Sequence, residues 1–490
     1  MNTVPGVRIE KANSFPPNPA GDYVLYWLIA NRRASWNYSL DRSVELAKGF
    51  NKPLLVLEAL RLDYPWASER FHRFILDGMA DNARDFKGGP VHYYPYMETR
   101  PGEGKGLLKA LSRKACVVVT DDYPAFFLPR MIAAAAEKVD VTMEKVDSNG
   151  ILPMRESSDV FPTAFSFRRF MQKRLPFWLF ERPKARPVSS TGLPGLTRVP
   201  SEILNRWPPV DPDMLSHKDT GKIKAFQVDH TVQAVKGRGG SARAKRVLKG
   251  FINNRLASYP EAHNEPEKKG TSGLSPYLHF GHISAHQIFH AIAKQEDWSF
   301  GHVSEQSSGG KRGWWGLSEG AEAFLDQLVT WRELGFNMCL LRPDYDRFES
   351  LPDWARQSLR EHERDIRPYL YRLPDFEQAE THDPLWNAAQ GQLRRKGVIH
   401  NYLRMLWGKK ILHWSKSPAE GLRIMIELNN KYALDGRDPN SYSGIFWVLG
   451  RYDRPWGPER PVFGKIRYMT SKNTARKYSV ANYIREYSVR

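Results

Sequence analysis

The stretch ACVVVTDD, Ala115–Asp122, is the clearest strand-like segment in the first half of the chain. It is short, continuous and rich in valine, which is typical of a strand that is buried on both faces. Three other segments share this character: YVLYWLI at Tyr23–Ile29, PLLVLEAL at Pro53–Leu60 and PVHYYPY at Pro90–Tyr96. Together they predict a sheet in the N-terminal part of the chain.

Helical patterns separate these strands. They cover Leu40–Phe50, Arg70–Phe86 and Gly104–Leu111, and another follows at Phe127–Lys138. Alternating strands and helices predict an α/β domain with a doubly wound parallel sheet. Such sheets bind ligands beyond the carboxyl ends of their strands, which makes DDYPAFF, after ACVVVT, a candidate ligand position. Neither GxGxxG nor a P-loop follows any strand, so a dinucleotide or P-loop phosphate site is not expected in this domain.

The composition changes twice along the 490 residues. Residues 183–245 are rich in Pro, Gly, Ser and basic side chains, as in RPKARPVSSTGLPG and KGRGGSARAKR, which is typical of a linker. From residue 246 apolar residues recur every three or four positions, which predicts helices. We therefore expect an α/β domain over 20–182, a linker over 183–245 and an all-α domain over 246–490.

The overall charge favours a polyanionic partner. Lys and Arg number 73 against 54 Asp and Glu, a formal charge of +19, which suits nucleic acid better than a membrane surface. The two cysteines, Cys116 and Cys339, have no partner at metal or redox spacing. No signal segment or run of about 18 apolar residues is present, so we expect a cytoplasmic protein, nucleoid-associated in a bacterium or archaeon.

Hydrolytic and metal chemistry are not favoured by the motifs. Neither HExxH nor GxSxG occurs in the chain. His282, His286 and His290 recur every four residues and share one helical face, but no Cys or carboxylate accompanies them in HISAHQIFH. Hydrogen-bonded structural histidines are the better interpretation, and we expect no metal.

Two loop-like segments could form a binding site. GTSGLSPYLHFGHIS, Gly270–Ser284, offers backbone N–H groups and hydroxyls ahead of a helix, which suits a phosphate or a capped helix entry. The segment Leu428–Trp456, LNNKYALDGRDPNSYSGIFWVLGRYDRPW, interleaves charged residues with aromatic ones in a run that looks loop-rich. It suits either ring recognition or a polar surface loop.

Three tryptophans have a suggestive spacing. Trp407 and Trp414 lie on one helical face in RMLWGKKILHW, a segment that otherwise looks like an ordinary basic helix, and Trp386 lies on the preceding helical pattern. Indoles close together could carry an electron, although spacing alone favours a tryptophan-rich helix interface.

These motifs together resemble the class II cyclobutane pyrimidine dimer photolyases of the photolyase/cryptochrome superfamily. The resemblance covers nearly the whole chain and rests on DDYPAFFLPRM, VDSNGILP, GTSGLSPYLHFGHIS, LVTWRELGFN, THDPLWNAAQ, HNYLRMLWGKKILHW, LNNKYALDGRDPNSYSGIFWVLGRYDRPW and GKIRYMTSKNT. It implies an N-terminal α/β antenna-type domain, a linker and a helical domain that binds FAD and DNA. It also implies a possible antenna chromophore, an 8-hydroxy-5-deazaflavin or a folate.

The resemblance assigns cofactor roles to particular residues. Asn429 resembles the amide that faces flavin N5 and steadies the reduced cofactor, and Arg404 with Asp435 resembles the salt-bridged pair against the isoalloxazine ring. The FAD phosphates would be held by the GTSGLS segment with a tyrosine nearby, which are Tyr259, Ser272, Gly273, Leu274 and Ser275. Trp386, Trp407 and Trp414 resemble the photoreduction tryptophans, with Trp407 closest to the flavin.

The same resemblance assigns the DNA contacts. Trp331 and Trp447 resemble the aromatic clamp on a flipped-out dimer, with Met405 in the same pocket. Gln327 occupies the position where the family usually has a glutamate that hydrogen-bonds the damaged pyrimidine. Residues 451–490 hold ten Lys or Arg and three acidic residues, and GKIRYMTSKNTARK within them is the likeliest surface to contact the DNA backbone. Arg451 and Arg454 are also expected to bind the DNA substrate.

The implied activity is light-dependent repair of pyrimidine dimers in DNA, in which excited, fully reduced FAD gives one electron to the dimer. We expect a monomer whose partner is damaged DNA. A cryptochrome-like photoreceptor with little or no repair activity is the alternative, and Gln327 slightly favours it because an amide supplies neither a proton nor a negative charge. A DNA-binding structural protein without cofactor is a third interpretation, which one absorption spectrum would test.

Overall fold

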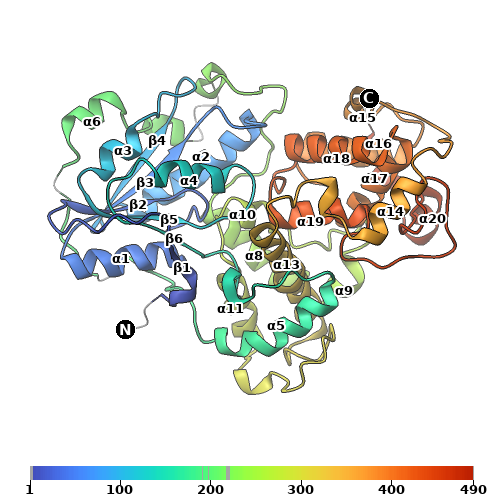
Figure 1. Ribbon diagram of the computed structural model, residues 1–490, viewed down its shortest axis with the longest axis horizontal. Coiled ribbons are helices and arrows are strands. Elements are labelled where there is room, and N and C mark those ends of the chain that lie inside the picture. Colours follow the sequence, from blue (N-terminus) through green and yellow to red (C-terminus); the bar gives the residue numbers. More distant parts are fainter. Residues whose placement is uncertain (1–3, 190, 197, 217–220, 489–490) are drawn as a thin grey trace. The chain divides into compact units, whose positions relative to one another are not determined.

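The computed structural model describes residues 4–189, 191–196, 198–216 and 221–488 (Figure 1). The chain divides into two compact units, each built from several stretches. Unit 1 comprises residues 1–156, 174–249 and 274–294, and unit 2 comprises residues 157–173, 250–273 and 295–490. The domain boundaries expected from the sequence stay a prediction.

Unit 1 contains one six-stranded sheet, in the order β1-β6-β5-β2-β3-β4. The strands are β1 (Ile9–Lys11), β2 (Tyr23–Trp27), β3 (Leu54–Leu60), β4 (Val91–Met97), β5 (Ala115–Asp121) and β6 (Met143–Val146). Neighbouring strands are parallel except for β1, which runs antiparallel to β6. The four predicted strands are confirmed; β1 and β6 were not predicted, because they are short and carry charged residues.

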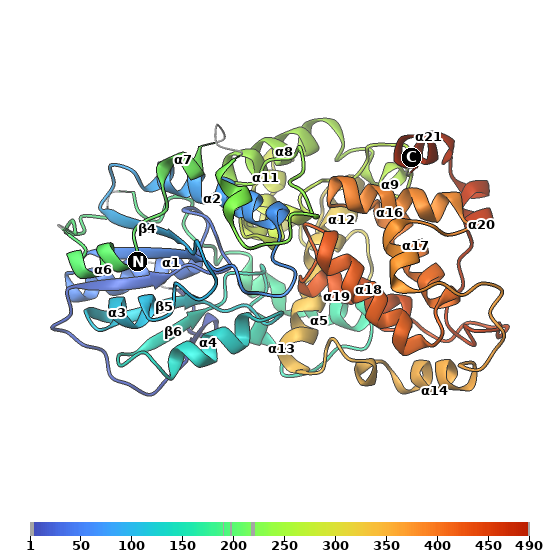
Figure 2. The ribbon, with the colours of Figure 1, turned by 90° about the horizontal axis from the view of Figure 1, so that it is seen from above.

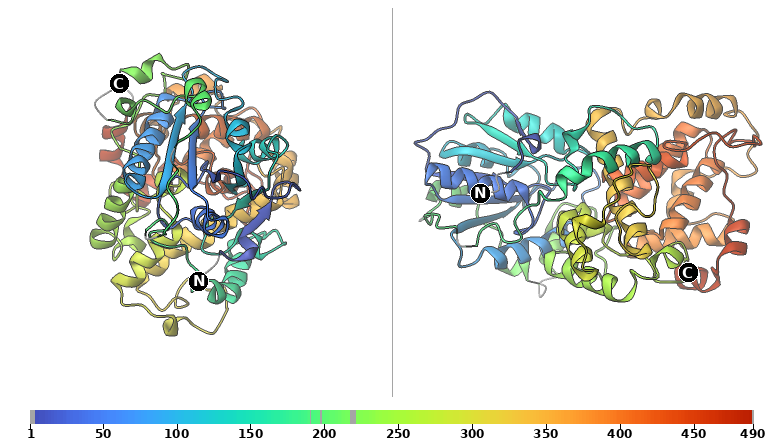
Figure 3. Two further views of the ribbon diagram at one scale, coloured as in Figure 1. Left: turned by 90° about the vertical axis from the view of Figure 1, so that its left-hand side faces the viewer. Right: turned by 90° about the horizontal axis from the view of Figure 1, so that it is seen from below.

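Helices cover both faces of this sheet (Figures 1 and 3). They are α1 (Tyr38–Phe50), α2 (Glu69–Phe86), α3 (Leu107–Ser112) and α4 (Leu128–Ala136), close to the predicted spans. The start of α1 is fixed by Asn37, whose side-chain oxygen accepts hydrogen bonds from the backbone N–H groups of Ser39 and Leu40. Every residue of β2 and β5 is buried, as their apolar sequences require. The expected α/β fold is confirmed.

The two carboxylates at the start of the segment expected to bind a ligand after β5 have partners within the protein. Asp121 is fully buried and accepts hydrogen bonds from the backbone N–H groups of Ile29 at 3.0 Å, Ala30 at 2.8 Å and Asn31 at 2.9 Å. The next residue, Asp122, is also buried and pairs with Arg155. These two carboxylates therefore hold the loops at the carboxyl ends of the strands rather than a ligand.

The rest of the chain is helical. Its α-helices are α5 (Ala164–Trp178), α6 (Ser201–Arg206), α7 (Pro212–Leu215), α8 (Ser241–Asn254), α9 (Tyr259–Ala262), α10 (Ser275–His279), α11 (Ala285–Gln295), α12 (Glu319–Leu325), α13 (Arg332–Leu341), α14 (Asp353–Glu361), α15 (Leu373–Gln378), α16 (Pro384–Lys396), α17 (Asn401–Trp414), α18 (Pro418–Tyr432), α19 (Pro439–Val448), α20 (Ser471–Lys477) and α21 (Ala481–Tyr487). A π-helix, Asp326–Trp331, joins α12 to α13. The predicted second helical half is confirmed. Within the described residues no helix is long and apolar enough to cross a membrane.

The helices α16 to α19 lie together in unit 2 (Figure 2). Glycines allow the closest approaches. A Cβ on Gly408 of α17 would lie 2.6 Å from a methyl group of Val448 in α19 and 3.1 Å from the sulfur of Met425 in α18. A Cβ on Gly335 of α13 would lie 2.8 Å from the carbonyl oxygen of Pro439 in α19. These contacts place α13 and α17 against α19, and α17 against α18.

The segment Leu428–Trp456 is not the loop-rich run that the sequence suggested. It contains the end of α18 and the whole of α19. The side chain of Asp438 accepts a hydrogen bond from the backbone N–H of Asn440, and Pro439 occupies the first turn. An Asp cap followed by Pro is a helix start, so the polar residues that suggested a loop are the start signal of α19.

Candidate functional site

The three predicted relay tryptophans lie together in the interior of unit 2. Trp386, Trp407 and Trp414 are exposed by 0%, 2% and 1%. The indole N–H of Trp386 donates to the backbone oxygen of Trp407 at 3.0 Å, and the rings of Trp386 and Trp414 are 6.2 Å apart. Asp383 fixes the start of α16 by accepting from the backbone N–H of Trp386. Trp386 therefore contacts both of the other tryptophans.

Aromatic rings continue outward from Trp414. Its ring centroid is 5.8 Å from that of Tyr371 and 4.8 Å from that of His382. The hydroxyl of Tyr371 hydrogen-bonds Nδ1 of His382 at 2.9 Å, and Tyr369, which is 46% exposed, stacks on His382. A continuous series of rings thus leads from the buried tryptophans to the surface.

At the other end, the indole N–H of Trp407 donates to the side-chain oxygen of Gln390 at 2.9 Å. Gln390 is fully buried on α16. This amide fixes the plane of the Trp407 ring, a role that the sequence analysis missed because glutamine in a helix carries no signal of its own.

The predicted pair of Arg404 and Asp435 is present as an ion pair, with 2.8 Å between the guanidinium nitrogen and the carboxylate oxygen. Both side chains are largely buried, and Arg404 is on α17, one turn before Trp407. Asn429 is 1% exposed on α18 and donates to the hydroxyl of Ser441 at 2.7 Å. Ser441, on α19, is a second residue that the sequence analysis missed. The cofactor roles of these residues stay predictions.

The predicted phosphate contacts are divided between the two units. In unit 2, Gly273 has a φ of +71°, a conformation that favours glycine, and the preceding residue is Ser272. In unit 1, Leu274 is buried and Ser275 is the first residue of α10. Tyr259 is buried in unit 2 and packs against Phe251 and Phe324.

The residues predicted to contact the lesion are partly exposed, although they lie in helices that are otherwise mostly buried. Gln327, Trp331, Met405 and Trp447 are each half-buried, whereas most of their neighbours on α13, α17 and α19 are buried. Gln327 and Trp331 both lie in the π-helix, a rare turn that is often found at functional sites. Trp331 is 6.5 Å from the ring of Tyr452.

The structure contradicts the prediction that Arg451 contacts DNA. Its side chain is 2% exposed, donates to the backbone oxygen of Tyr345 at 2.8 Å and stacks on Phe446 at 3.8 Å. Its place in a basic segment predicted a surface cation, because composition does not reveal burial. Arg454, by contrast, is exposed and lies 4.5 Å from the ring of Trp456.

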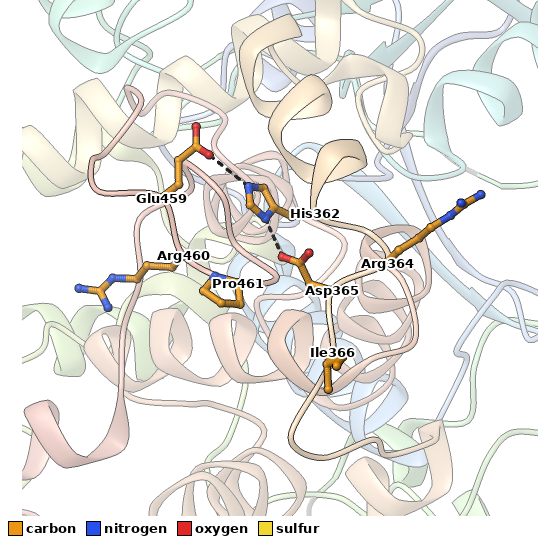
Figure 4. A pocket seen from close by; sticks show the side chains of 7 residues that line it. All are labelled: His362, Arg364, Asp365, Ile366, Glu459, Arg460 and Pro461. Carbon is orange, nitrogen blue, oxygen red and sulfur yellow. Dashed lines mark hydrogen bonds and ion pairs between the residues drawn. The ribbon is translucent and has the colours of Figure 1, made fainter.

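An open depression of about 630 Å³ lies beside this basic segment (Figure 4). At its centre His362 hydrogen-bonds Asp365 at 2.6 Å and Glu459 at 3.4 Å. The bond to Asp365, followed by that to Glu459, raises the pKa of His362 above its ordinary value. His362 thereby ties the segment after α14 to Glu459, close in sequence to the exposed Arg460.

The repeated histidines in unit 1 have structural partners. His282 accepts a hydrogen bond from the backbone N–H of Gly240 at 3.0 Å, and His286 hydrogen-bonds the backbone oxygen of Gly150 at 3.1 Å. Both are buried, and burial lowers the pKa of His282 to about 3. They are neutral core histidines, as the sequence suggested.

Arg404 keeps a buried polar atom with capacity for a ligand. Its Nε is buried and has no hydrogen-bond partner among the described residues. Buried polar groups are almost always satisfied, so this nitrogen is a candidate contact for a bound polar group. A donor of this kind fits the polar edge of a planar cofactor.

Comparison with known proteins is consistent with this geometry. No protein-family model matches the chain. The chain is 31% identical to a deoxyribodipyrimidine photo-lyase of Methanothermobacter thermautotrophicus, covering 97% of each protein. It is 33% identical to a protein of the same name from Arabidopsis thaliana, covering 99% of this chain and 93% of that protein. With that from Potorous tridactylus the identity is 32%, over 95% of this chain and 81% of the other.

Two solved structures share the fold at low identity. A class III photolyase from Agrobacterium tumefaciens gives a TM-score of 0.62 at 17% identity, covering 95% of this chain and 86% of that chain. An archaeal photolyase from Sulfolobus tokodaii, solved with two FAD molecules, gives 0.64 at 13% identity, covering 95% and 89%. The likeness in sequence extends over nearly the whole chain, and the fold agrees with it. The chain therefore belongs to the deoxyribodipyrimidine photo-lyases of the photolyase/cryptochrome superfamily.

Proposed function

We propose that this protein repairs cyclobutane pyrimidine dimers in DNA with light, by electron transfer from reduced FAD to a dimer flipped out of the duplex. The observation that carries the proposal is the buried tryptophan series, which reaches α17 one turn from the Arg404–Asp435 ion pair. An electron path is of use only if it leads to a redox group. The family membership makes DNA photorepair the natural use of that path.

FAD is the cofactor that these residues would hold. Arg404 and Asp435 would flank the flavin ring, Asn429 would face N5, and Ser272, Gly273, Leu274 and Ser275 would contact the phosphates with Tyr259 nearby. Bound there, reduced FAD supplies the excited electron donor for dimer splitting. The protein's part is to fix ring and substrate in position and to exclude water.

The contacts support one order of the relay. The indole N–H of Trp386 donates to the backbone oxygen of Trp407, and the Trp386 ring lies 6.2 Å from that of Trp414, so we propose the sequence Trp407, Trp386, Trp414 from the flavin outward. Trp414 is then the outer member, because it is the one that contacts Tyr371 and His382. In this order Trp414 would be the tryptophan that receives electrons from the surface.

The dimer would be bound outside the duplex, because a base inside the stack cannot reach a buried cofactor. Trp331 and Trp447 are half-buried, so part of each ring could stack on the extruded bases, and Met405 and Gln327, also half-buried, would contribute to the same pocket. Stacking contributes about 1–3 kcal/mol per base, comparable with the cost of unstacking. The selectivity for damaged DNA then comes from the lesion itself, because it has already weakened the base pairing and lowers the cost of extrusion.

Arg454 tests the contact with the DNA backbone. It is exposed in the segment Arg451–Arg490, which has an excess of basic residues. We expect Arg454→Gln to weaken binding to damaged and undamaged duplexes alike, and to reduce the slope of log affinity against log salt by about 1. Arg423→Gln, which removes an exposed arginine of α18, should leave the slope unchanged. An unchanged slope for Arg454→Gln would exclude this arginine as a phosphate contact.

A substitution at Gln327 tests how the damaged base is hydrogen-bonded. A glutamate there restores a carboxyl group that can donate a proton, which the amide cannot supply. We expect Gln327→Glu to raise the number of dimers split per absorbed photon without changing flavin content. Repair of a defined dimer-containing oligonucleotide under limiting light measures this. A lower yield would show that the amide is the functional group at this position.

One experiment decides between repair and signalling. The purified protein, chemically reduced, is illuminated with an oligonucleotide that contains one cyclobutane dimer, and thymine absorbance is followed. Light-dependent recovery supports repair, while binding of flavin without recovery favours the photoreceptor alternative. The class II assignment rests on motifs such as HNYLRMLWGKKILHW and is part of the same proposal.

The antenna, the oligomeric state and the location also belong to the proposal. An aromatic cluster in unit 1, in which Trp66 and Phe126 stack at 5.9 Å and Tyr64 and Phe127 at 5.6 Å, follows β3 and β5. Planar rings of this kind suit an 8-hydroxy-5-deazaflavin or a folate. Absorption spectra after incubation with each compound test this. We further propose a monomer that acts on DNA in the cytoplasm or nucleoid.

A further inference from the structure

Lys409 is a lysine in the interior of unit 2. Its side chain is 0% exposed, although the motif GKK in α17 suggests a solvated basic face. A buried ammonium group is costly and is normally paired with an opposite charge. Among the described residues Lys409 forms no salt bridge; its ammonium group contacts a backbone carbonyl and an indole ring.

Both contacts lie at the carboxyl end of α19. The ammonium group of Lys409 donates to the backbone oxygen of Val448 at 2.6 Å. It also lies 5.0 Å from the ring centroid of Trp447. The last carbonyls of a helix are unsatisfied and carry partial negative charge, so a cation is favourable there. The same cation is attracted to the electron-rich face of the indole.

The neighbouring packing leaves Lys409 little freedom. The adjacent residue Gly408 lies against Val448, where even a Cβ would be too close. The remaining charges that act on the ammonium group are the carboxylate of Asp453 and the guanidinium of Arg467. Arg467 is itself 5.8 Å from the Trp447 ring. The Trp447 ring therefore lies within cation–π distance of both Lys409 and Arg467.

We infer that Lys409 is a positioning residue for substrate binding, which holds the Trp447 indole in the orientation that stacks on the extruded base. This inference rests on the proposed function, in which Trp447 is one side of the lesion clamp. Lys409 itself touches no substrate. Its effect on DNA must pass through Trp447 and disappear when that ring is removed.

The charge of Lys409 predicts opposite pH dependences for folding stability and for dimer affinity. Burial lowers the pKa of Lys409 from 10.5 to about 7, with Asp453 opposing and Arg467 adding to the shift. Between these two values the unfolded chain binds the proton more tightly, so folding stability rises with pH. Affinity for the dimer should move the other way, because the cation that holds Trp447 is lost as pH rises through about 7.

The test is a double-mutant cycle with Lys409→Met and Trp447→Leu, using a duplex with one cyclobutane dimer and the same duplex undamaged. We expect Lys409→Met to weaken dimer binding roughly tenfold, to leave undamaged binding unchanged and to abolish the fall in affinity above neutral pH. Lys409→Gln, which keeps a donor for Val448 but not the charge, should behave in the same way. In the Trp447→Leu background Lys409→Met should have no further effect.

Lys410→Met is the matched control. Lys410 is the next residue of α17, also largely buried, and lies 5.0 Å from the ring of Trp414 instead. It should leave dimer affinity and its pH profile unchanged. Wild-type affinity for Lys409→Met, or an equal loss with and without Trp447, would overturn the inference while leaving the clamp in place. No loss for Trp447→Leu alone would overturn the clamp and the role of Lys409 with it.

Discussion

Trp407→Phe is expected to abolish photoreduction of the bound flavin while leaving dimer splitting by the chemically reduced protein nearly intact. A phenyl ring is far harder to oxidise than an indole, so the first step from the flavin outward is lost. Trp386 and Trp414 remain, but they no longer have a partner next to the cofactor. The measurement follows flavin absorbance during illumination with an external reductant, beside a repair assay on dithionite-reduced protein.

The change also has a structural cost that must be separated from the electronic one. The indole N–H of Trp407 satisfies the fully buried oxygen of Gln390. Phe leaves that acceptor without a donor, which costs about 1–3 kcal/mol. The control is Trp314→Phe, because Trp314 is a buried tryptophan of unit 2 whose indole N–H has no partner among the described residues. Equal loss of photoreduction and of repair in Trp407→Phe would contradict the relay.

The fold was largely predictable because its strands are long and apolar. Segments such as ACVVVTDD have enough consecutive apolar residues to identify a strand buried on both faces. The sequence MEKV of β6 does not identify a strand, since half of its residues are charged. It is a strand because it pairs in register with β5. The helix α19 was missed for a related reason. Its start signal, Asp438 followed by Pro439, is also a turn signal, and only packing against α13 and α17 decides between the two.

The grouping of the three tryptophans was predictable because tryptophan is rare and easily recognised in a sequence. The spacing of Trp407 and Trp414 placed them on one helical face, while their role in a relay rests on the resemblance and stays a prediction. Burial was not predictable from residue type, and it contradicts the expectation that two basic residues lie on the surface. Lys409 and Arg451 are basic residues in basic segments, yet both are buried. Their partners are backbone oxygens and aromatic rings, which no sequence pattern marks.

Long-range polar pairs were equally invisible, and one of them carries a large expected effect. Arg168 on α5 donates through Nε to Asp326 at 2.7 Å and through a terminal nitrogen to the backbone oxygen of Gly309 at 3.2 Å. The two side chains of the pair are exposed by only 4% and 9%. Asp326 is the first residue of the π-helix that carries Gln327 and Trp331.

Arg168→Met should therefore lower the free energy of unfolding by about 3–5 kcal/mol, since it leaves the carboxylate of Asp326 buried without its cation. Denaturant unfolding measures the loss. Replacing both partners, Arg168→Met with Asp326→Leu, should recover most of it, because an apolar pair leaves no uncompensated charge. Arg342→Met, which breaks a more exposed pair with Asp344, should cost less than about 1 kcal/mol. If the double variant recovers stability but still binds dimer-containing DNA weakly, the pair also positions Gln327 and Trp331, the two π-helix residues proposed to contact the substrate. If both stability and binding recover, the role of the pair is confined to folding.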